Sequence, residues 1–109
     1  LGLVTAGKRD RINQTLPNNF KSFFNVIVTS EDYQEGKPSP EPYQKAIQQI
    51  DADVLFAVEN APFGILSAKA AGLKTVAFTS TNSASALSES DFIIKDLIEL
   101  KSIVADYGE

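Results

Sequence analysis

Short apolar runs alternate along the chain with stretches in which apolar residues recur at helical spacing. Apolar runs rich in β-branched and aromatic residues and bounded by turn-forming residues are typical of buried strands. On this basis the sequence predicts strands at residues 1–4, 26–28, 54–58, 74–78 and 92–94.

The intervening segments predict helices. Ser39 is a good N-cap, Pro40 suits a first helical position, and Gly72 is a typical helix stop. The predicted helices cover residues 8–16, 40–50 and 63–71, and a last helix is capped by Asp96 and runs through Leu97, Leu100 and Val104. The helix at 40–50 has an apolar stripe made of Tyr43, Ala46, Ile47 and Ile50. We expect Phe20, Phe23 and Phe24 to pack a short helical or irregular piece, and residues 79–90 to form a loop with a short helix.

Strands that are apolar throughout and alternate with helices favour an α/β fold with a parallel sheet covered by helices on both faces. In such sheets the ligand site lies at the carboxyl ends of the strands. We therefore expect the polar residues that follow the predicted strands to gather at one edge.

Composition narrows the chemistry. The net charge of −4 argues against a nucleic-acid partner, and no apolar stretch is long enough to span a bilayer. The absence of Cys favours a cytoplasmic protein, and the absence of both Cys and His leaves carboxylates, Lys, Ser/Thr, backbone amides and a hard metal for any chemistry. The chain opens at Leu1 inside an apolar run, so we expect it to be part of a longer protein.

Two of the candidate site residues carry phosphate-binding chemistry. Thr5 ends the first strand, where its hydroxyl and the amides of Ala6 and Gly7 at a helix start favour an anion. Lys37 lies between a flexible Gly36 and a rigid proline, which favours an ammonium held in place to neutralise a phosphoryl oxygen. Taken alone, Thr5 also fits an empty N-cap and Lys37 a solvated loop lysine.

The third candidate is the pair Glu59 and Asn60. A carboxylate directly after an apolar strand needs a partner if it is buried, and a hard cation is a natural one. A carboxylate that caps the following helix is the simpler interpretation of the same position. Each signal is weak alone, whereas the ordered set is specific.

This ordered set resembles motifs II, III and IV of the haloacid dehalogenase (HAD) superfamily, most closely its beta-phosphoglucomutase-like phosphatase group. The motifs read Leu3-Val4-Thr5, Gly36-Lys37-Pro38-Ser39-Pro40-Glu41-Pro42-Tyr43, and Val58-Glu59-Asn60-Ala61-Pro62-Phe63-Gly64-Ile65 through Ala70-Ala71-Gly72. Ser90-Asp91-Phe92-Ile93-Ile94 extends the likeness to nearly the whole chain. The resemblance implies a Rossmann-like core, of which residues 1–109 would be the C-terminal portion.

The resemblance also implies roles. Thr5 and the amide of Ala6 would bind the transferring phosphoryl group, and Lys37 would hold that group beside a nucleophilic carboxylate. Glu59 and Asn60 would help to place Mg²⁺. The implied reaction is attack by an Asp on a small phosphorylated metabolite, giving an aspartyl-phosphate that is hydrolysed or passed on.

The sequence departs from the family pattern by two missing parts and one substitution. The first motif, an Asp-x-Asp followed by Gly-Thr or similar, is missing, and the acidic candidates Asp10, Asp32, Asp51 and Asp53 stand in the wrong context. The cap domain that selects substrate is missing as well. We therefore expect the nucleophile strand to come from an N-terminal segment of the same protein, and this chain alone to be inactive. The resemblance implies that this strand lies between the strand ending at Thr5 and the strand ending at Glu59. Asn60 replaces the commoner Asp, which removes one negative charge from the metal site.

Three alternatives stay open. A signalling receiver domain also places a Thr and a Lys-Pro at strand ends, but its Thr-to-Lys gap is shorter and it has no place for Glu59. A metal-free 2-haloacid dehalogenase fits Asn60 but not Glu59 or Thr5. A non-catalytic binding module with a degenerate site fits a chain without a nucleophile. The sequence does not separate phosphatase from mutase.

Overall fold

The computed structural model describes residues 1–79, 89–96 and 98–107, in which strands and helices alternate as the sequence predicts. The strands are β1 (Gly2–Val4), β2 (Val26–Val28), β3 (Phe56–Glu59), β4 (Lys74–Phe78) and β5 (Phe92–Ile94). The helices are α1 (Arg9–Thr15), α2 (Asn18–Lys21), α3 (Glu41–Ile47), α4 (Pro62–Ala70) and α5 (Glu99–Tyr107).

All strand pairs are parallel, but the strands form two separate ladders. β1 pairs with β2, with Leu3 opposite Ile27, and β3, β4 and β5 form the second ladder in that order, with Val76 between Val58 and Phe92. β1 and β3 each lie at the edge of their own ladder. The expected parallel α/β fold is therefore present, divided between β1 and β3.

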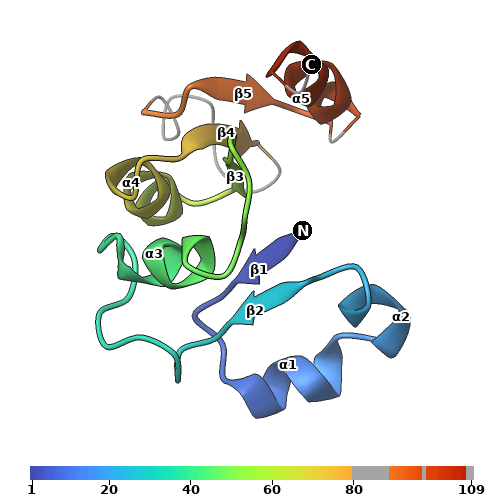
Figure 1. The fold of residues 1–109 in the computed structure, drawn as a ribbon, viewed down its shortest axis with the longest axis vertical. Helices are drawn as coiled ribbons and strands as arrows, with labels where there is room; N and C mark the ends of the chain where they lie inside the picture. The colour runs from blue at the N-terminus through green and yellow to red at the C-terminus, as the bar shows by residue number, and fades with distance from the viewer. Residues whose placement is uncertain (80–88, 97, 108–109) are drawn as a thin grey trace.

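Helices α3 and α4 join the two ladders (Figure 1). α3 packs on β1 and β2, α4 packs on β3 and β4, and the two helices contact each other. Tyr43 of α3 forms a buried cluster with Ala57 of β3 and Ala68 of α4, and Val4 of β1 packs against this cluster. A continuous apolar layer thus holds the ladders in place although no strand pairs them.

Several element boundaries differ from the predictions by one to three residues, as at the start of α3 and of β3. α3 begins at Glu41 with Pro40 in the cap position, and Ser39 accepts a hydrogen bond from the Glu41 amide at 3.3 Å. β3 begins at Phe56, not at residue 54, because its ladder with β4 starts at Phe56 opposite Lys74. Gly72 ends α4 as predicted, with a φ of +88° that favours glycine.

The short helical piece expected around the phenylalanines is present as α2, but the expected packing is wrong for Phe20 and Phe23. Phe20 and Phe23 are 52% and 62% exposed instead of packed, and their rings contact each other with centroids 6.4 Å apart. The expected loop at 79–90 falls mostly outside the described residues, as does Leu97. Within the described part of the chain, no helix is long and apolar enough to cross a membrane.

Candidate active site

The five predicted site residues line one cleft between the two ladders. The cavity has a volume of about 680 Å³ and follows the edges of β1 and β3. Its walls are residues 1–6 and 55–60, together with Lys37, Tyr43, Ile50, Ala52 and Phe78. Thr5, Ala6, Lys37, Glu59 and Asn60, all chosen from sequence, therefore face a common space.

Lys37 lines this cleft and bonds to residues on both of its edges. Its ammonium donates to the Glu59 carboxylate at 2.5 Å and to the backbone carbonyl of Val4 at 3.4 Å. The same nitrogen stands 5.2 Å from the centre of the Tyr43 ring, within cation–π range. One cation thereby touches the carboxyl end of β1 and the carboxyl end of β3.

Glu59 ends β3 and is 9% exposed, so its charge needs a partner. Lys37 and the hydroxyl of Tyr43 both donate to its Oε1. Burial, together with the adjacent carboxylate, raises the pKa of Tyr43, so the hydroxyl stays protonated and remains a donor. In this structure the partners of the buried carboxylate are thus a lysine and a tyrosine, whereas the sequence suggested a metal cation.

Thr5 lies in the turn after β1 and is held on three sides. Its amide donates to the Val28 carbonyl at 3.0 Å, its hydroxyl oxygen accepts from the Gly7 amide at 3.0 Å, and its carbonyl accepts from the Tyr33 hydroxyl at 3.1 Å. The structure corrects one part of the expected anion pocket. The Gly7 amide, expected to be open to an anion at a helix start, donates to the Thr5 hydroxyl oxygen instead, because α1 starts only at Arg9 and the Thr5 side chain closes the turn.

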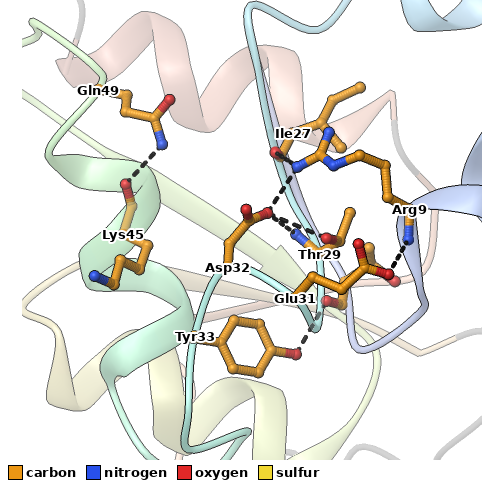
Figure 2. Close-up of polar contacts among 9 residues, drawn as sticks. Arg9, Ile27, Thr29, Glu31, Asp32, Tyr33, Lys45 and Gln49 are labelled. Atoms are coloured by element: carbon orange, nitrogen blue, oxygen red, sulfur yellow. Dashed lines mark hydrogen bonds and ion pairs between the residues drawn. The ribbon is translucent and has the colours of Figure 1, made fainter.

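A polar brace fixes the loop after β2 against this turn (Figure 2). The Arg9 guanidinium donates to Asp32 at 2.8 Å and to the Ile27 carbonyl at 3.3 Å, and the Arg9 amide donates to Glu31. Asp32 also accepts from the amide and hydroxyl of Thr29, at 2.7 and 3.1 Å. The Thr29 amide, aided by its hydroxyl and by Arg9, holds the pKa of Asp32 below its ordinary value.

The oxygen donors near Lys37 suit Mg²⁺ in kind but not in number. Glu59 and Asn60 present carboxylate and amide oxygens, the ligands that this hard cation prefers. The residues described by the structure contain no group of three or more Asp, Glu, His or Cys that could hold a metal. A bound Mg²⁺ would therefore take further ligands from water or from another segment.

The acidic residues that the sequence set aside lie elsewhere. Asp51 and Asp53 are exposed and precede β3, whereas Glu59 ends it, so the strand separates them from the site. Asp32 is engaged by Thr29 and Arg9. None of these three, nor Asp10 in the first turn of α1, lines the cleft beside Lys37.

Sequence reasoning missed Tyr43 as a site residue. Its place in the apolar stripe of α3 predicted a core side chain, and it is indeed only 7% exposed. A buried tyrosine nevertheless brings a hydroxyl that requires a partner. A tyrosine six residues after the site lysine was the available signal.

Comparison with known proteins places this cleft in a family. The sequence model of the haloacid dehalogenase-like hydrolases matches residues 1–78. The chain belongs to this family. Membership decides against the receiver-domain alternative, and the relatives below place the chain among its beta-phosphoglucomutase-like members.

Two curated relatives of this HAD chain are phosphatases. It is 39% identical over 104 residues to the validoxylamine A 7'-phosphate phosphatase of Streptomyces hygroscopicus subsp. limoneus, covering 93% of this chain and 49% of that protein. It is 34% identical over 113 residues to the pyrophosphatase PpaX of Bacillus thuringiensis (strain Al Hakam), covering 97% and 52%. The chain thus spans about half the length of these relatives.

A solved structure supports the same assignment. A protein from Bacteroides vulgatus assigned as a beta-phosphoglucomutase superposes with a TM-score of 0.72 at 31% identity. The match covers 93% of this chain and 43% of that one. The fold is therefore part of a HAD-type, Rossmann-like α/β domain.

Proposed function

We propose that the full-length protein containing this chain is a HAD-type phosphatase or phosphomutase that acts on a small phosphorylated metabolite. The observation that carries the proposal is the position of Lys37. Its ammonium lies between the carboxyl ends of β1 and β3, next to the turn that bears Thr5. A fixed cation at this edge of a parallel sheet suits a phosphoryl group.

The groups of this chain would bind and neutralise the phosphoryl group. The Thr5 hydroxyl and the Ala6 amide would donate to its oxygens, and Lys37 would offset its negative charge as an anionic nucleophile approaches. The nucleophile would be an aspartate of another segment, whose oxygen forms a bond to phosphorus while the ester P–O bond breaks. The ester oxygen would take a proton from a general acid of that same segment and leave as the alcohol. Water would then cleave the aspartyl-phosphate, or a second hydroxyl would accept the phosphoryl group.

Glu59 and Asn60 are the residues that would hold Mg²⁺. Mg²⁺ bound there would screen the charge on the phosphoryl oxygens. Glu59 would have two duties, because it also anchors Lys37. Asn60 would contribute its amide oxygen without a charge, so we expect weaker metal binding than an aspartate there would give.

The cleft itself supports the origin of the nucleophile. Its walls are the edges of β1 and β3, the strands whose ends carry the site. We infer that an additional strand of the full-length protein fills the cleft, pairs with both edges and brings the aspartate to Lys37. Two ladders would then become one sheet, in which the backbone groups on the cleft side of β1 and β3 have strand partners.

The test is hydrolysis of para-nitrophenyl phosphate by the full-length protein with Mg²⁺ and with EDTA. Lys37→Ala should lower turnover by roughly 10²–10³, the usual effect of losing one preorganised charge. Lys101→Ala, an exposed lysine of α5, is the matched control and should not change it. Acid quenching during turnover of ³²P-labelled substrate should recover phosphate bound covalently to the protein.

Other outcomes separate the alternatives. Turnover of Lys37→Ala within about threefold of wild type would remove Lys37 from the mechanism. Halide release from a 2-haloacid without Mg²⁺ would favour the dehalogenase alternative. Binding of phosphorylated compounds without turnover of any of them would favour a non-catalytic module.

A further inference from the structure

The hydroxyl of Tyr43 has a role that packing does not explain. Tyr43 is 7% exposed in the cluster that joins the two ladders, where a phenylalanine ring would fill the same space. Its hydroxyl donates to Glu59, and the ring lies beside the Lys37 ammonium. One side chain thus contacts both charged members of the candidate site.

Both donors meet the same oxygen. Lys37 and Tyr43 each bond to Oε1 of Glu59, which fixes the rotation of the carboxylate and leaves Oε2 outside this pair of bonds. Lys37 alone could follow the carboxylate as it turned, because its stem is long and flexible. Tyr43 cannot do so, since its ring is buried on α3.

Gly64 provides the space in which the carboxylate lies. A Cβ added at this position in the first turn of α4 would collide with the carboxylate atoms of Glu59, although nothing in the backbone conformation of Gly64 requires glycine. The chain thus keeps a glycine inside a helix, where it is unfavourable, at the point where the Glu59 carboxylate rests. The Glu59 carboxylate is thus bonded by Tyr43 and Lys37 and lies directly against α4 at Gly64.

We propose that Tyr43 is a positioning residue, which orients Glu59 so that this carboxylate places Lys37 and the metal together, and that Gly64 is required to leave room for that orientation. This inference rests on the proposed function. It extends that function from the residues that bind phosphate and metal to the contacts that hold them in place.

The experiment compares two substitutions in the full-length protein with a matched control. Tyr43→Phe removes only the hydroxyl, and Gly64→Ala displaces the carboxylate without touching Tyr43. Each should weaken Mg²⁺ binding, measured by calorimetry, and lower kcat by about 10–100-fold, the range for residues that orient metal ligands. KM for para-nitrophenyl phosphate should change less than kcat, because the Thr5 hydroxyl and the Ala6 amide, which do not contact Glu59, still bind the phosphate.

The control is Thr75→Val. This substitution removes a buried hydroxyl of β4 that bonds to Asp91 and lies outside the cleft. It should lower the melting temperature and leave Mg²⁺ affinity and kcat unchanged. Circular dichroism should show all three variants folded. The inference is overturned if folded Tyr43→Phe keeps Mg²⁺ affinity and kcat within about twofold of wild type. It is equally overturned if Thr75→Val lowers both as much as Tyr43→Phe does.

The Lys37→Ala variant separates failure of the positioning role from failure of the proposed function. If Lys37→Ala is inactive while Tyr43→Phe matches wild type, the proposed function stands and only the positioning role fails. If the wild-type protein shows no Mg²⁺-dependent phosphate release, the proposed function fails and the positioning role fails with it.

Discussion

The ion pair between Lys37 and Glu59 dominates the site at the scale of single residues. Its side chains are 19% and 9% exposed, so both charges are largely removed from water. Such a pair roughly offsets its own desolvation, but removal of one partner leaves an uncompensated charge and costs about 3–5 kcal/mol. The pair is therefore weak evidence for stability, and its place in the cleft points instead to function.

Asn60 allows the metal assignment to be tested in both directions. Asn60→Asp adds an anionic ligand and should tighten Mg²⁺ binding, whereas Glu59→Gln removes one and should weaken it, each by roughly tenfold or more. Calorimetric titration of the full-length protein and its two variants measures this. Equal affinities in all three proteins would mean that the pair is structural.

The sequence predicted which polar residues at strand ends and in loops would lie together, whereas it did not single out a residue inside an element. Thr5, Lys37 and Glu59 line one cleft because parallel strands bring such positions to one edge. Tyr43 sits in an apolar stripe, where helical periodicity does not distinguish a tyrosine from a phenylalanine. Its hydroxyl became informative only when Glu59 was found beside it.

At the scale of elements, the loop after β2 is held by charge rather than by apolar packing. Arg9 of α1 bonds the edge carbonyl of Ile27 and the Asp32 carboxylate, and Ser30 donates to Gly7 of the site turn at 3.1 Å. Capping an edge strand in this way also protects it from pairing with another chain. The brace thus ties the position of Thr5 to the conformation of the loop.

Asp32 should make this brace sensitive to acid. Its pKa is below the ordinary value in the folded protein, so its stabilising contribution is present above the unfolded pKa of about 3.9 and is lost as the pH falls through the folded value. Asp32→Asn should lower the melting temperature of the full-length protein at pH 7 and make less difference at pH 3.

Melting temperatures at a series of pH values measure this effect, with Asp51→Asn, an exposed carboxylate before β3, as the control. A difference between wild type and Asp32→Asn that stays constant from pH 7 to pH 3 would contradict it.

The order and type of the elements could be predicted from sequence, because apolar runs indicate buried strands and apolar stripes at helical spacing indicate helices. The boundaries of the elements and the packing of surface side chains could not be predicted in this way. Residues 54 and 55 continue an apolar run, yet the ladder begins only where β4 provides a partner. Phe20 and Phe23 suggested a core, but both lie at or just after a four-residue helix, are largely exposed and contact each other.

At the scale of the whole molecule, the two ladders form one compact body with a cleft through its sheet. The radius of gyration is 13.6 Å, close to the value of about 13 Å for a compact domain of this length. The apolar layer of α3 and α4 holds the two ladders together. Sequence patterns could predict parallel strands, whereas the break between β1 and β3 followed only from the missing family motif.

The cleft predicts that residues 1–109 alone fold poorly and do not turn over substrate. Within the described part of the chain, neither β1 nor β3 has a strand partner on its cleft side. Each buried backbone group left without a hydrogen bond costs about 1–3 kcal/mol, while a whole domain is stable by only about 5–15 kcal/mol. A few such groups therefore offset the stability that the apolar layer provides. Thermal unfolding of the isolated chain, followed by circular dichroism, should show a broad transition, and phosphate release with Mg²⁺ should be absent. A cooperative transition together with hydrolysis of para-nitrophenyl phosphate would refute both the open sheet and the assignment of the nucleophile to another segment.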